Sequence, residues 1–200
     1  MGISTCAIIE NRLTGDKLGM LADQLIANSR LLACMREFDI AVRTDRPQLR
    51  AELYAEAWQF HEIERWVVEG GWDAGCRGQC DGPFGTIYLY ENLAKLSWYG
   101  CRWHVFLEDV KFRNLLLEAT RLISTMLSAG AASTAIFVPG SSHDESLVHD
   151  ELHRSMPELL TFLSEKCGPP AQSLESIAQE PFKGYFVTQW SASNTEIGGS

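Results

Sequence analysis

Long apolar runs are missing from this 200-residue chain: no stretch approaches 18 consecutive apolar residues, the length expected of a membrane-spanning helix. The opening Met-Gly-Ile-Ser-Thr-Cys lacks a basic segment followed by an apolar one, so it does not predict a secretory signal. The sequence also lacks a Gly-x-Ser-x-Gly elbow, a phosphate-binding Gly-x-x-x-x-Gly-Lys-Ser/Thr loop and a dinucleotide fingerprint. These absences predict a cytoplasmic protein with no membrane partner and without the motifs of common enzyme classes.

Basic residues are scarce, especially towards the end of the chain. The sequence has 17 Lys and Arg against 26 Asp and Glu, which gives a formal net charge of −9. Residues 141–200 hold nine acids and three bases, and therefore contribute −6 of that charge. A surface of this kind repels phosphate backbones, so we expect no nucleic-acid partner. It attracts a basic protein and speeds the encounter, although a plain solvated surface has the same composition.

Apolar residues make up 46% of the sequence and charged residues 22%, as is typical of a folded domain with a substantial core. We predict one domain over residues 1–190 and a polar, mobile tail over residues 191–200. The six cysteines are widely scattered, and in a chain of this size without a signal they favour free thiols over a disulfide framework.

Hydrophobic periodicity predicts a single α+β domain, with a mixed or mostly antiparallel sheet and several packed helices. The clearest helix covers residues 112–127, where apolar side chains recur at i, i+3 and i+4 as far as Gly130. Other helices are predicted over residues 18–32, 45–60 and 143–167, with a fresh turn after Ser155, and a short one from residue 173. Strands are predicted over residues 3–9, 38–42, 86–90, 94–107 (with a bend or bulge at Gly100), 133–138 and 185–189. Six glycines and a proline predict a loop over residues 70–85.

Three of the five histidines lie between His143 and His153, in the helix that a Ser142–Glu145 capping-box pattern predicts. Glu145, His149 and His153 recur every four residues, a spacing that suits a divalent metal bound by two imidazoles and a carboxylate. The segment His149-Asp-Glu-Leu-His153 resembles the His-Glu-x-x-His motif of zinc proteases. Asp150 replaces the catalytic glutamate of that motif, so the resemblance does not extend to peptidase activity. We favour the alternative of an acidic, solvent-facing helix whose histidines border the buried stripe.

A second cysteine and histidine set has the layout of a small structural zinc module: Cys76-x3-Cys80 in the glycine-rich loop, then Cys101-x2-His104 after a predicted hairpin. Residues three apart in a strand point to opposite faces, however, so Cys101 and His104 would diverge. The thiols are then ordinary core or loop residues. We therefore predict no cofactor, with zinc or another divalent metal as the alternative at either site.

Trp72 lies in a glycine-rich segment with little means of burying a large side chain, and interface hot spots favour tryptophan. Together with the acidic positions Asp144, Glu145, Asp150 and Glu151, it predicts a partner-binding surface. We hypothesise a non-enzymatic, cytoplasmic, acidic binding protein, by analogy an inhibitor or immunity-type neutraliser of a basic protein. The competing hypotheses are a metal-dependent hydrolase using the His/Glu helix, and a homodimer formed through exposed aromatic side chains.

Overall fold

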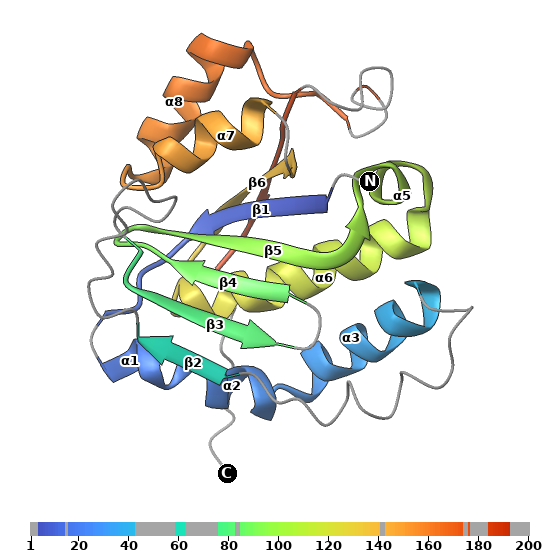
Figure 1. Cartoon of the computed structure of the whole chain (residues 1–200), viewed down its shortest axis with the longest axis vertical. Helices are drawn as coiled ribbons and strands as arrows, with labels where there is room; N and C mark the ends of the chain where they lie inside the picture. Colours follow the sequence, from blue (N-terminus) through green and yellow to red (C-terminus); the bar gives the residue numbers. More distant parts are fainter. Residues whose placement is uncertain are drawn as a thin grey trace.

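The fold is built on a seven-stranded sheet in which all neighbouring strands are antiparallel (Figure 1). The computed structural model describes residues 4–14, 16–42, 59–62, 76–82, 85–140, 143–173, 176 and 184–192. The strands are β1 (Ser4–Glu10), β2 (Gln59–Glu62), β3 (Gly78–Gly82), β4 (Gly85–Leu89), β5 (Leu93–Arg102), β6 (Ser133–Pro139) and β7 (Phe186–Trp190). Their order across the sheet is β2-β3-β4-β5-β1-β6-β7, so β1 lies between strands β2–β5 on one side and strands β6–β7 on the other. The predicted α+β fold with an antiparallel sheet is confirmed.

Helices cover both faces of the sheet (Figure 1). On one face lie α1 (Asp16–Gly19), α2 (Leu21–Ala27), α3 (Ser29–Val42), α5 (Trp103–Glu108) and α6 (Val110–Leu127). On the other face lie α7 (His143–Asp150) and α8 (Met156–Cys167). Within the described part of the chain, no helix is long and apolar enough to cross a membrane.

Strand β1 alternates between two hydrophobic clusters, because successive side chains of a strand point to opposite faces. Ala7 and Ile9 belong to the first cluster, which contains the buried residues of α2, α3, α5 and α6. Cys6 and Ile8 belong to the second cluster, which contains the buried residues of α7 and α8. Both faces of the central strand are therefore covered, as its apolar run from Cys6 to Ile9 requires.

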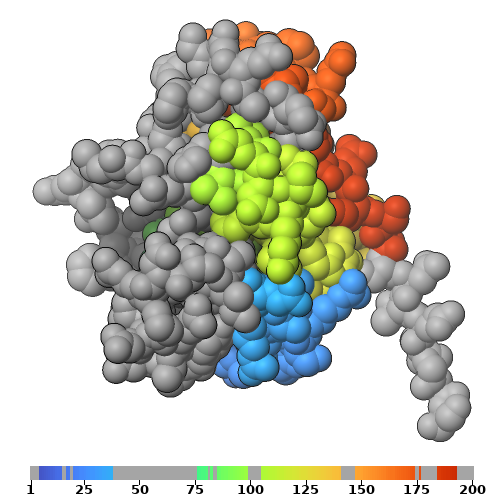
Figure 2. Space-filling view, turned by 90° about the vertical axis from the view of Figure 1, so that its right-hand side faces the viewer, coloured from blue at the N-terminus to red at the C-terminus, as the bar shows by residue number. Residues whose placement is uncertain are grey.

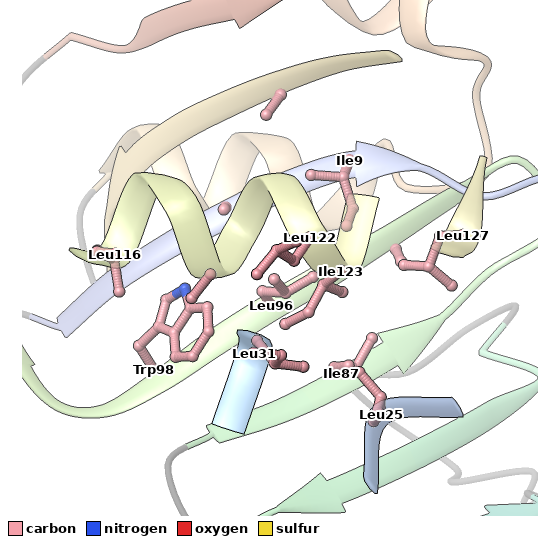
Figure 3. Close-up of a cluster of buried hydrophobic side chains, with 14 of the residues drawn as sticks. Ile9, Leu25, Leu31, Ile87, Leu96, Trp98, Leu116, Leu122, Ile123 and Leu127 are labelled. Atoms are coloured by element: carbon pink, nitrogen blue, oxygen red, sulfur yellow. The ribbon is translucent and has the colours of Figure 1, made fainter. Parts of the chain in front are cut away.

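Helix α6 is the main element of the first cluster, and its predicted extent is confirmed (Figure 3). Asp109 caps its start by accepting a hydrogen bond from the backbone N–H of Phe112 at 3.0 Å. The buried stripe then runs through Leu116 and Ile123 to Leu127. Gly130, at φ +80°, takes the left-handed conformation in the turn after the helix.

Two predictions of secondary structure from the sequence are wrong. Residues 38–42, predicted as a strand, continue helix α3, whose buried Leu31 and Met35 pack in the first cluster beside α6. The tertiary packing of a long helix outweighs the strand preference of five alternating residues.

Residues 70–85, predicted as a loop, contain β3, which gains hydrogen-bonded neighbours on both sides and buries Cys80 opposite Ile87. These contacts offset the entropy that glycine loses in a strand.

Strand β5 ends earlier than predicted, because residues 103–108 form helix α5. The predicted irregularity at Gly100 is confirmed: Thr5 of β1 faces Trp98, whereas Ser4 faces Arg102, so residues 99–101 are extra on the β5 side. Such a bulge bends a strand. The predicted helix over residues 45–60 lies mostly outside the described residues, and its last two residues belong instead to β2.

Candidate functional site

The acidic part of the sequence folds as α7 and α8, joined by residues 151–155. Five apolar side chains, none more than 3% exposed, hold this pair on the sheet: Val148, Leu152, Met156, Leu159 and Leu163. They share the second cluster with Ile8 of β1 and with Ile136 and Val138 of β6. The buried stripe fixes which sides of the two helices face solvent.

Four described carboxylates lie on the outward side of this pair, and we call them the acidic surface: Asp150, Glu151, Glu158 and Glu165. Three of them are exposed and Glu151 is half-buried. Residues 150–166 contain two basic residues, Arg154 and Lys166, so four acids less two bases leave a net charge of −2. The predicted site residues Asp144 and Glu145 also belong to α7, but their side chains lie outside the described part.

Arg154 lies among these carboxylates and neutralises part of their charge. Its Nε donates a hydrogen bond to Oε2 of Glu151, and its guanidinium carbon lies 5.2 Å from the centre of the Phe162 ring. The hydrogen bond to Glu151 is the main cause that raises the pKa of Arg154, and the charges of Glu151, Glu158 and Glu165 add to it. The acidic surface therefore already holds one guanidinium, over an aromatic ring, in the way such surfaces bind arginine.

Glu158 closes a capping box at the start of α8. Its Oε2 accepts hydrogen bonds from the backbone N–H of Ser155 at 2.8 Å and from the Ser155 hydroxyl at 2.6 Å. Both bonds favour the ionised carboxylate and lower the pKa of Glu158, with the hydroxyl as the larger cause. The fresh turn predicted after Ser155 is confirmed, and it fixes one carboxylate of the acidic surface in position.

The three candidate metal ligands of the histidine tract do not share a helix. Helix α7 ends at Asp150, so His149 lies in its last turn, whereas His153 lies in the following turn. The His153 side chain is 66% exposed, with its Nε2 3.9 Å from Glu151, and His149 is half-buried. The continuous helix on which the four-residue spacing relied therefore ends between His149 and His153. Among the side chains that the structure describes, no group of three potential ligands could hold a metal ion.

Two cysteines of the second candidate metal site, Cys76 and Cys80, lie in different clusters. Cys76 is half-buried beside the second cluster, and its Sγ donates to the carbonyl oxygen of Gly78 at 3.3 Å. Cys80 is fully buried in the first cluster, on the other face of the sheet. Cys101 lies in β5 and His104 in α5, with side chains outside the described part. The sheet thus separates the first two predicted ligands.

The aromatic side chains that the structure describes are all buried or half-buried. Trp72, the tryptophan predicted to contact a partner, lies outside the described residues. Trp98 is 3% exposed and packs in the first cluster, so it is a core residue (Figure 3). Trp190 is half-buried in β7 at the edge of the sheet.

A second charged group, whose residues are not among the predicted site residues, links α3 to α6. Glu118 accepts two hydrogen bonds from Arg121, at 2.7 and 2.8 Å, and lies 2.9 Å from Arg30. The bonds from Arg121 lower the pKa of Glu118 despite its partial burial. Its sequence signal is the Glu118–Arg121 spacing of three on a helix. Two arginines surround one carboxylate here, so this group lacks the excess negative charge of the acidic surface.

Any proposal of a function therefore rests on the geometry described above, because comparisons with known proteins found no match. No family model, curated protein or solved structure matches the chain.

Proposed function

We propose that the protein is a non-enzymatic binding protein whose acidic surface docks a basic protein, as an inhibitor or immunity-type neutraliser does. The observation that carries this proposal is the excess of carboxylates on α7 and α8, two helices fixed to the sheet by a fully buried stripe. A charged surface held on rigid elements loses little conformational entropy on binding.

The chemistry of the surface favours arginine as the partner's contact residue. Arg154 already combines a carboxylate hydrogen bond with a position over the Phe162 ring. Asp150 and Glu165 are exposed carboxylates on the same two helices, and they offer further acceptors for a planar guanidinium, which pairs well with carboxylates. The long-range field of a chain with net charge −9 accelerates the encounter with a basic partner.

The test begins with capture of partners on the immobilised chain at low salt, followed by purification of each captured protein and measurement of its Kd by calorimetry. We expect a basic protein whose affinity falls as salt rises, because exposed charges are screened. The double variant D150N/E165Q should weaken binding several-fold, mainly through slower association.

The matched control is D23N/E108Q, which removes the same charge from two exposed acids on α2 and α5. It should change the affinity much less than D150N/E165Q. Equal effects of the two double variants, or a Kd that does not respond to salt, would contradict docking at the acidic surface.

A further inference from the structure

Strand β7 forms an edge of the sheet that carries no charge. Among the described strands, it pairs with β6 alone and stands last in the sheet order. Its sequence, Phe-Val-Thr-Gln-Trp, contains neither a charged residue nor a proline, the residues with which natural sheets commonly block pairing at their edges. Figure 2 shows these residues, in red, at the surface of the molecule. The edge therefore has the features of a strand that can accept another strand.

Charge favours a second copy of the chain as the strand that pairs here. Two copies, each with a net charge of −9, repel one another wherever their acids approach. Residues 184–192 contain no Asp, Glu, Lys, Arg or His, and neither does the neighbouring β6. A basic partner finds no opposite charge to pair with along these residues, whereas a like-charged copy meets no like charge there.

The sequence of β7 is also complementary to itself. In an antiparallel pair centred on Thr188, each threonine faces the other, Val187 faces Gln189, and Phe186 faces Trp190. Phe186 and Trp190 lie on one face of the strand, where both pack against the first cluster. Aromatic pairs and threonine pairs are among the cross-strand contacts that stabilise antiparallel strands.

We infer that β7 pairs with β7 of a second copy across a two-fold axis at Thr188, so that two sheets become one continuous sheet. The arrangement is isologous, because each copy contributes the same strand. Five residues of pairing form a small interface, below the size of stable protein–protein contacts, so the dimer should be concentration-dependent. This inference is independent of the acidic surface and of the function proposed for it.

A charge-swap experiment tests the two-fold axis. Thr188→Lys and Thr188→Glu each place two like charges directly opposite one another, and each should weaken self-association of the full chain. An equimolar mixture pairs lysine with glutamate and should associate about fivefold more tightly than either variant alone, since cross-strand charge pairs act on this scale. Sedimentation velocity over a concentration series measures all three samples and the unsubstituted chain.

Gln172→Lys and Gln172→Glu are the matched controls, because Gln172 is exposed and lies outside β7. These variants should dimerise like the unsubstituted chain, alone or mixed. Circular dichroism verifies folding, and Gln189→Lys, at an exposed position of β7, supplies a second variant that should weaken the dimer without disturbing the core. A chain that stays monomeric at every concentration would overturn the inference. So would a dimer indifferent to the Thr188 and Gln189 variants, or a Thr188 mixture no tighter than its components.

Discussion

Replacing Leu159 with alanine tests whether α8 is held to the sheet by its buried stripe, on which the position of the acidic surface depends. Leu159 is 0% exposed and belongs to the second cluster. The substitution removes three buried carbons, which corresponds to about 2.4 kcal/mol of lost transfer free energy. The cavity left behind adds to this loss, so we expect the free energy of unfolding to fall by about 3 to 5 kcal/mol.

Leu160 is the matched control, because it is the same residue type at the next position of α8 but is only half-buried. Leu160→Ala should lower the free energy of unfolding by about 1 kcal/mol. Urea unfolding followed by circular dichroism measures both variants. The free energy of unfolding should fall by about 2 kcal/mol for each molar increase in urea. The urea concentration at the unfolding midpoint should therefore fall by roughly 1.5 to 2.5 M for Leu159→Ala and by about 0.5 M for Leu160→Ala. Equal shifts, or a larger shift for Leu160→Ala, would refute the packing of α8 described above.

Three further predictions concern the cap of α8, the sheet and the metal hypotheses. Ser155→Ala should raise the pKa of Glu158 in an NMR titration, and an unchanged pKa would count against the cap. The cap stabilises the fold fully above the ordinary pKa of a carboxyl group. This stabilisation is lost as the pH falls through the lowered pKa of Glu158. Gly85→Ala should lower the free energy of unfolding by roughly 1 to 3 kcal/mol in urea titrations, because the new Cβ would lie 2.5 Å from the carbonyl oxygen of Ser97; an unchanged midpoint would contradict this clash. Elemental analysis of tag-free protein should find substoichiometric metal, whereas stoichiometric metal that is lost in His149→Ala would favour the hydrolase hypothesis.

Elements with a clear local pattern could be predicted from the sequence, whereas elements that depend on long-range contacts could not. Helix α6 repeats its apolar spacing over four turns, and β6 contains an apolar run from Ala135 to Val138 that stops at Pro139, so both were identified. Residues 38–42 offered only five alternating positions, too few to reveal that they extend α3. Strand β3 is rich in glycine, and its stability comes from pairing with β2 and β4, contacts that no local pattern contains.

The candidate site was predictable where a local motif defines it. Ser155, a residue type that caps helices, indicated a fresh turn at the start of α8, and the acidic composition indicated a charged face. The end of the helix between His149 and His153 was not predicted: α7 stops at Asp150, and a new helix begins at Met156. Likewise, only the tertiary packing shows that Cys80 lies in the first cluster and Cys76 beside the second.

The central position of β1 has a consequence for synthesis of the protein. Its neighbours β5 and β6 end 92 and 129 residues after Glu10, at Arg102 and Pro139. At a ribosomal rate of roughly 5 to 20 residues per second, β1 waits about 5 to 20 s before β5 is complete. During that interval an apolar strand with two unpaired edges is exposed to other nascent chains. The share of newly made protein that escapes aggregation then depends on whether a chaperone protects β1 and on how slowly β6 pairs with its second edge.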